Sequence, residues 1–351
     1  MPFQMIAAPH LRGPNTTSKY MFKVVIGLIP GIIAATYFFG WGVLTNIVVA
    51  NIAALLFETI ALKLRKHSLK KYLTDGSAIV TATLLGIAIP QLSAWWLPVV
   101  GVFMAIVIAK HLYGGLGYNP FNPAAIGYVV LLISFPKEMS QWAAPDWLGP
   151  VSPDKLSLGE TLGVVFCNTI PDTTSLDLLT HASPLDFLKG QLKLGLEIPQ
   201  IISKDPEMWG TFAGKGWEWM NVALLFGGLY MIWKKVITWH IPVGMLGSML
   251  VLSAIVYVIS PETAVNPIYH IFSGGIMLGA FFIATDPVTS CTSVKGRLFF
   301  GIGAGSLTYI IRTWGGYPDG IAFAVLLMNL SAPYIDRFTI PSIYGAKKAE
   351  K

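Results

Sequence analysis

The sequence predicts an all-α polytopic membrane protein, with about ten transmembrane helices in two inverted five-helix repeats and a large extracytoplasmic loop between them. Apolar residues make up 54% of the 351 residues, charged residues make up 12%, and the mean hydropathy is +0.62. Soluble domains carry about twice that charged fraction. The apolar residues form long continuous runs, and a hydrophilic stretch divides these runs into two blocks. This pattern excludes a soluble globular domain.

Ten apolar stretches have the character of membrane-spanning helices, since about 20 apolar residues cross a hydrocarbon core of about 30 Å. They lie at 22–39, 41–62, 76–90, 95–113, 124–136, 219–235, 240–260, 268–284, 297–313 and 318–335. The predicted organisation is an N-terminal tail (1–21), a first five-helix repeat (22–136), a loop (137–217), a second five-helix repeat (218–335) and a C-terminal tail (336–351).

The two blocks resemble each other. The segments from Gly76 to Pro90 and from Ser273 to Pro287 are both apolar, begin with small residues and end at a proline. Each reaches only about 22 Å as a helix, which is short of a full crossing. Tyr113-Gly114-Gly115 is matched by Trp314-Gly315-Gly316. With five spans in each half, such repeats are inverted in the membrane.

The positive residues predict the orientation. In this arrangement 17 of the 24 lysines and arginines lie on the side of the two termini, whereas residues 138–218 carry eleven acidic residues. Positive residues accumulate on the cytoplasmic side. We therefore expect a multi-pass protein of a bacterial inner membrane, in contact with lipid, with cytoplasmic termini and a periplasmic loop. The net charge of +6 reflects this topology, and nothing else indicates a nucleic-acid partner.

The loop contains a hydroxyl-rich segment from Thr180 to Asp186, with the sequence THASPLD. Ser183 could cap a helix, with Pro184 at its first position and Asp186 in its first turn. The same free backbone N–H groups would also bind a phosphate. On the residues alone, the simple helix start is favoured.

Inverted repeats with interrupted spans place binding sites near the membrane midplane. The candidates are Asn119 and Asn122 within GGLGYNPFN, and Asp286 within ATDP. The amide pair suits a flat ligand with a polar edge, such as an isoalloxazine ring. Alternatively, both asparagines cap helices ahead of the prolines that follow them. No residue spacing predicts a metal site.

Charged residues also fall near the predicted span ends, namely Lys110, Asp286 and Arg312. Charged groups within a membrane are costly unless they are paired or face water, which makes them candidates for function. Their places near helix ends also allow snorkelling of the charge toward the interface.

Four segments carry a resemblance to a known family: GGLGYNPFNPA at 114–124, THASPLD at 180–186, LGAFFIATDPVTS at 278–290 and GGYPDGIAFAVLL at 315–327. In this order they resemble the D subunit of the Rnf electron-transport complex. That family is similar to the B subunit of the sodium-pumping NADH:quinone oxidoreductase, and its fold is similar to that of urea and ammonium channels.

The resemblance implies FMN in the loop, joined by a phosphoester to a threonine in an S-x-A-T pattern. Thr180 matches the first serine, Ala182 the alanine, and Ser183 the flavin-bearing threonine. The chain thus departs from the family at the attachment residue, although serine keeps a hydroxyl that can bear the phosphoester. Flavin on Ser183, flavin on Thr180 and flavin held without a covalent bond remain open. Riboflavin is expected as a second flavin in the membrane half.

The resemblance implies a membrane subunit of an ion-translocating ferredoxin:NAD oxidoreductase that moves sodium ions or protons. The chain carries no iron–sulfur ligand run and no nucleotide-binding fingerprint, so its activity would require the other Rnf subunits A, B, C, E and G. The alternatives are the B subunit of the sodium-pumping NADH:quinone oxidoreductase, or a small-solute channel or transporter with the same repeat.

Overall fold

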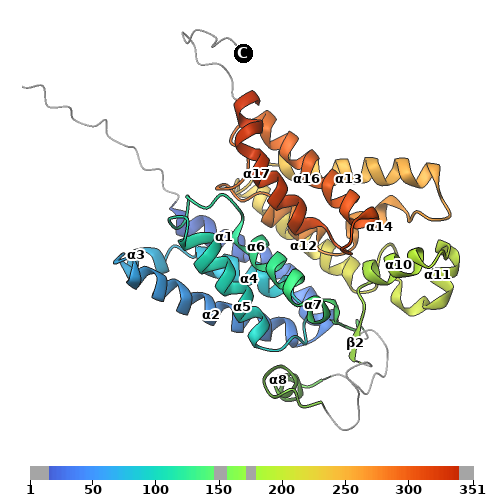
Figure 1. Ribbon diagram of the computed structural model, residues 1–351, viewed down its shortest axis with the longest axis horizontal. Coiled ribbons are helices and arrows are strands. Elements are labelled where there is room, and N and C mark those ends of the chain that lie inside the picture. Colours follow the sequence, from blue (N-terminus) through green and yellow to red (C-terminus); the bar gives the residue numbers. More distant parts are fainter. Residues whose placement is uncertain (1–15, 146–155, 171–178, 340–351) are drawn as a thin grey trace, which may run out of the picture.

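The computed structural model describes residues 16–145, 156–170 and 179–339. Long helices form the body of the molecule, and α8, α10 and α11, which come from the central loop, lie at one end of it (Figure 1). We call this end the loop side. The described chain begins and ends at the opposite end of the helices (Figure 1).

The first half contains three long helical segments and two short ones, besides the five-residue α3. Thr16 directly precedes its first helix, and the Thr16 hydroxyl accepts a hydrogen bond from the amide of Lys19, a standard N-cap. In the fourth predicted span, the α-helix continues without a break into a π-helical segment. The elements are α1 (Thr17–Phe39), α2 (Gly42–Leu64), α3 (Leu69–Leu73), α4 (Ser77–Ala88), α5 (Trp96–Phe103), η1 (Met104–His111) and α6 (Pro123–Ser134).

The second half is also helical, but one predicted span, 268–284, is broken. The break lies at Gly274, where φ is +63°, a conformation that favours glycine. Asn221 donates to the carbonyls of Phe272 and Gly274 at 3.0 and 2.8 Å, which satisfies backbone groups that the break exposes. The elements are α12 (Trp217–Trp233), α13 (His240–Ile259), α14 (Pro267–Phe272), α15 (Ile276–Leu278), η4 (Gly279–Ile283), α16 (Val294–Trp314) and α17 (Ile321–Thr339).

Each of the ten predicted stretches coincides with a helix or with this broken helix. Among the described residues, α1, α2, α13 and α17 are long and apolar enough to cross a membrane. The prediction of an all-α, multi-pass membrane protein is therefore confirmed. The count of ten spans and their inverted repetition stay predictions.

The central loop contains more regular structure than the sequence indicates. A two-stranded antiparallel sheet pairs Trp142 with His181 and Ala143 with Thr180, so the segment before Ser183 is fixed to the end of the first half. The elements of the loop are α7 (Pro136–Ser140), β1 (Trp142–Ala143), α8 (Leu158–Cys167), β2 (Thr180–His181), α10 (Pro184–Lys193), α11 (Ile198–Lys204) and the 3₁₀ turn η3 (Pro206–Met208).

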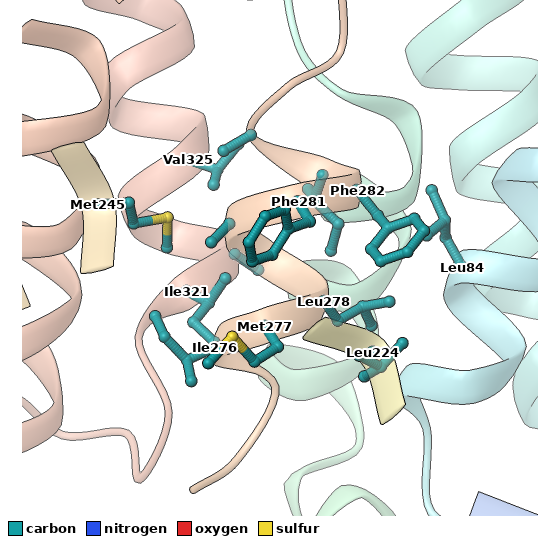
Figure 2. Packing of buried hydrophobic residues seen from close by; sticks show 14 of the residues in the cluster. Leu84, Leu224, Met245, Ile276, Met277, Leu278, Phe281, Phe282, Ile321 and Val325 are labelled. Atoms are coloured by element: carbon teal, nitrogen blue, oxygen red, sulfur yellow. The ribbon is translucent and has the colours of Figure 1, made fainter. Parts of the chain in front are cut away.

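The two halves share one hydrophobic core. Helices α1 and α12 pack closely because Gly27 and Gly227 face each other where they cross. Figure 2 shows the broken helix at the centre of this core, with Phe281 and Phe282 on η4. Leu84 of α4 belongs to the same cluster as Phe282, so the first half contributes directly to the packing of the broken helix.

Candidate functional site

Ser183 is the N-cap of α10. Its backbone is extended, with φ −60° and ψ 152°, and its Oγ accepts a hydrogen bond from the amide of Asp186 at 3.2 Å. Pro184 occupies the first helical position, where its missing N–H costs nothing. The helix start expected from the sequence is therefore confirmed.

The Ser183 side chain also lines a cavity of about 310 Å³ between the two halves, which we call the loop-side cavity. Its size falls at the lower end of the range of about 300–1,000 Å³ typical of small-molecule sites. Four aromatic residues from four different elements or loops line it: Tyr128, Trp142, Trp217 and Tyr317. A cavity with aromatic walls and few polar groups is suited to a flat ring system.

The charges around this cavity are mixed. Asp186 lines it, and burial raises the pKa of its carboxyl group, while Lys189 and Lys193 act in the opposite direction. A negative ligand near Ser183 would therefore meet the carboxyl group of Asp186, while the two lysines lie further along the same helix.

Lys189 fixes α10 to the membrane half. Its Nζ donates to the carbonyls of Ile311, Arg312 and Tyr317 at 3.1, 3.0 and 2.7 Å. The first two of these carbonyls belong to the last turn of α16, where a cation is favoured. Burial, followed by the nearby Lys193, lowers the pKa of Lys189 to about 8. The helix that begins at Ser183 is thus held against the end of α16.

A second cavity, of about 430 Å³, lies nearer the side of the termini, and we call it the inner cavity. The three membrane-half residues singled out from the sequence, Asn119, Asn122 and Asp286, all line it. Lys110 and Phe282 contribute further wall. The structure therefore brings together candidates that lie about 165 residues apart in the sequence.

Each of the three also has a local structural role. Asn122 caps α6 by accepting from the amide of Ala125 at 3.1 Å, and it donates to the carbonyl of Ile283 at 3.3 Å. Asp286 accepts from the Val288 amide and the Thr289 hydroxyl. Capping by Asn122 is therefore confirmed.

Asn119 does not cap a helix, contrary to one of the sequence-based alternatives. Its side chain accepts from the amide of Gly117 and donates to the carbonyl of Phe121. It therefore stabilises the loop ahead of α6. Asn119 thus holds this loop, Asn122 caps the helix, and both line the inner cavity.

Thr180 and Ser183 lie on different cavities. Thr180 is in β2 and lines a cavity of about 490 Å³ with Trp95 and Asn168. Ser183 lines the loop-side cavity. The sequence placed both hydroxyls in one segment, whereas the sheet directs them to separate surroundings.

Sequence reasoning missed the residues that lie between the loop-side cavity and the inner cavity. Leu84 of α4 and Ala124 of α6 line both the loop-side and the inner cavity. Both residues continue ordinary apolar helix patterns, so no signal in the sequence could distinguish them from other core positions.

The alternative in which Lys110 and Arg312 snorkel toward the interface is wrong. Both side chains are buried. Lys110 is paired with Glu58 at 2.8 Å, and Arg312 with Asp319 at 3.1 Å. Pairing removes the cost of an isolated charge inside the protein.

Comparisons with known proteins agree over nearly the whole length of the chain. Residues 4–345 match the model of the family described as "NQR2, RnfD, RnfE family". The chain belongs to this family. It is 48% identical over 355 residues to the D subunit of the ion-translocating oxidoreductase complex of Aliivibrio salmonicida (strain LFI1238), covering 99% of this chain and 100% of that one. It is 47% identical, with the same coverage, to the proteins of that name in Salmonella newport (strain SL254) and Salmonella enteritidis PT4 (strain P125109).

Proposed function

We propose that this chain is the flavin-bearing membrane subunit of an ion-translocating ferredoxin:NAD oxidoreductase, and that it relays electrons while sodium ions or protons cross the membrane. The observation that carries the proposal is the place of Ser183, at the edge of an aromatic cavity between the two halves. Relatives of almost equal length are named as subunits of an ion-translocating oxidoreductase complex. The partners would be subunits A, B, C, E and G of that complex.

The residues around Ser183 fit an FMN phosphoester. Ser183 is partly exposed, and the first free N–H groups of α10 favour a phosphate. Asp186 opposes this with its carboxyl group, whose pKa burial raises. The bound flavin would supply the redox chemistry, and the protein would orient its ring and tune its potential.

The inner cavity fits a second, non-covalent flavin such as riboflavin. The amide groups of Asn119 and Asn122 and the Asp286 carboxylate line one cavity and offer both donors and acceptors. Their local hydrogen bonds hold these side chains in defined positions. Preorganised polar groups in an otherwise apolar cavity are typical of cofactor sites.

A relay between the two cavities is supported by the wall that they share. At Leu84 and Ala124 the cavities are one side chain apart. Both residues are apolar and buried, so they exclude water from the space between the two sites. Two flavins held in these cavities would be separated by this wall.

The inverted repeat is supported by the way equivalent helices meet. The first helices of the two halves, α1 and α12, pack together, and so do the last, α6 and α17. Each half also has a buried cation at the start of its short span. Lys110 donates to Ser77 Oγ at 2.8 Å, and Arg312 to the Ser273 carbonyl at 3.3 Å. With cytoplasmic termini, the loop side would face the periplasm.

The test is to locate the flavin in the intact complex. After purification and denaturing electrophoresis, we expect a fluorescent band for this chain, and an added FMN mass on the peptide from Asp177 to Lys189. Ser183→Ala should remove both signals. Thr180→Ala is the matched control, because it removes the neighbouring hydroxyl and should leave both signals intact.

Two other results would contradict the assignment. A signal that persists in Ser183→Ala and disappears in Thr180→Ala would move the attachment to Thr180. An unmodified peptide and a dark band, with no flavin released from the purified complex, would favour the small-solute channel or transporter instead.

A further inference from the structure

Helix α8 carries an apolar stripe that no other described residue covers. Leu158, Leu162 and Phe166 are spaced four residues apart and therefore lie on one face, with exposed fractions of 51%, 38% and 47%. On the adjoining side of the helix, Val164 and Val165 are buried. The helix is thus docked on the protein by one apolar surface and presents a second one outward.

The place of α8 is fixed at the loop-side ends of two membrane helices. The amide of Trp95, directly before α5, donates to the carbonyl of Val165 at 3.1 Å, and α8 also contacts α2. Trp41, directly before α2, and Trp95 are both partly exposed. Exposed tryptophans at helix ends are typical of the interface between lipid and water. The stripe therefore lies at the level of this interface.

Helix α2 also presents an apolar face outward. Val48, Ile52, Leu56 and Ile60 are exposed at the same four-residue spacing. In a multi-pass membrane protein such a face contacts acyl chains, because nothing in the hydrocarbon core penalises it. Helix α8, which contacts α2, therefore lies against a helix whose outward face is apolar.

The polar side chains of α8 lie outside the stripe or form hydrogen bonds at the start of the helix. Ser157 and Glu160 form a capping box, in which each side chain accepts from the other's backbone amide. The hydrogen bonds from Ser157 lower the pKa of Glu160, which keeps this residue charged and in water. Asn168 ends the helix in the left-handed conformation, a common helix stop.

We propose that α8 is an interfacial helix whose Leu158–Leu162–Phe166 stripe is immersed in the lipid leaflet on the loop side of the membrane. Helices that lie in the interface keep their own backbone hydrogen bonds, place large apolar residues in the lipid and turn their charged face to water. In this arrangement α8 anchors the central loop to the bilayer at the edge of the first half. This role is independent of any flavin.

The test uses a fluorophore at defined positions in the full complex, reconstituted in lipid bilayers. The exposed Cys167 is first replaced by serine, whereas Cys291 is buried and remains in place. Leu162→Cys then places a bimane label on the stripe. Glu160→Cys is the matched control, since two residues along a helix correspond to about 200° of rotation. Quenching is measured with brominated lipid and with aqueous iodide.

We expect the label at position 162 to be quenched several-fold more by brominated lipid than the label at position 160, with the opposite order for iodide. Equal iodide quenching at both positions would mean that the stripe faces water, and would overturn the proposal. A label at position 162 protected from both quenchers would mean that another subunit covers the stripe, and would overturn it as well. Neither outcome bears on the flavin at Ser183, which the mass of the 177–189 peptide reports separately.

Discussion

The Lys110 ammonium on η1 lies 2.8 Å from the Glu58 carboxylate on α2, and the two side chains are 3% and 1% exposed. Lys110 also donates to Ser77 Oγ at the start of α4. The second carboxylate oxygen is 2.9 Å from His111 Nε2, a close approach without hydrogen-bond alignment. One buried ion pair therefore links three helical segments of the first half.

Removing one partner of this pair should be far more harmful than removing both. Lys110→Met leaves the Glu58 carboxylate buried without its cation, and breaking a buried pair in this way costs about 3–5 kcal/mol. We expect a large fall in the thermal unfolding temperature of the purified complex. The double variant Glu58→Gln, Lys110→Met removes both charges and should recover most of the loss. A double variant no more stable than Lys110→Met would contradict this account.

The crossing of α1 and α12 should tolerate no side chain at Gly227. A Cβ at this position would overlap the carbonyl oxygen of Gly27, and backbone cannot yield as a flexible side chain can. Gly227→Ala should therefore destabilise the protein by about 1–3 kcal/mol or more, as overpacking does. Unfolding temperature and the yield of assembled complex are the measurements.

Gly247→Ala provides the matched control for that substitution. Gly247 lies within α13, and a Cβ there meets no atom within 4 Å. Alanine is favoured over glycine in a helix by about 1 kcal/mol, so this variant should be as stable as the natural protein or more so. If the two alanine variants behaved alike, the close approach of Gly27 and Gly227 would not limit the packing.

The stability of α10 against the membrane half should change with pH in the alkaline range, because Lys189 titrates there. Burial lowers the pKa of this amine in the folded protein to about 8 from its ordinary value of 10.5. Between these values the unfolded chain binds more protons than the folded one, so stability rises with pH in this window and is lowest below about pH 8. We expect hydrogen exchange of α10 to slow, relative to the intrinsic rate, as the pH is raised through this range.

Lys189→Met tests the cause of that pH dependence. The variant loses the three bonds to the carbonyls at the end of α16, so exchange in α10 should be faster at every pH. Its dependence on pH between about 8 and 10.5 should be flatter than that of the natural protein, because no titrating amine remains at position 189. A slope equal to that of the natural protein would assign the effect to another group.

The membrane helices could be predicted from the sequence because the length of an apolar run decides whether it can cross the hydrocarbon core. Long apolar runs give α2 and α13 to within two residues at each end, and they give the end of α1 but not its start, which lies five residues earlier than predicted. The break at Gly274 could not be predicted, because its cost is met by Asn221 of a distant helix. The sequence shows the glycines at which such a helix can break. It does not show which distant side chain donates hydrogen bonds to the carbonyls that the break exposes.

The candidate site was predicted in its polar residues and missed in its apolar ones. Asn122 and Asp286 stand out because polar groups next to proline are unusual in apolar surroundings, whereas Ser183, in the hydrophilic loop, was singled out by the family resemblance. Leu84 and the aromatic walls do not stand out, since a buried leucine or tryptophan is ordinary core. That Leu84 separates two cavities follows only from tertiary packing.

Substitutions at Asn122 should separate its capping role from a role in flavin binding. Asparagine and aspartate cap helices equally well, whereas alanine costs about 1 kcal/mol. Asn122→Asp keeps the acceptor for the amide of Ala125 but loses the donor that contacts the Ile283 carbonyl. If the amide helps to hold riboflavin in the inner cavity, both variants should lose released riboflavin, and only Asn122→Ala should also lose stability from the cap. The FMN proposed on Ser183 serves as the internal control and should remain. Full riboflavin content in Asn122→Asp would show that the amide donor is not part of the binding site.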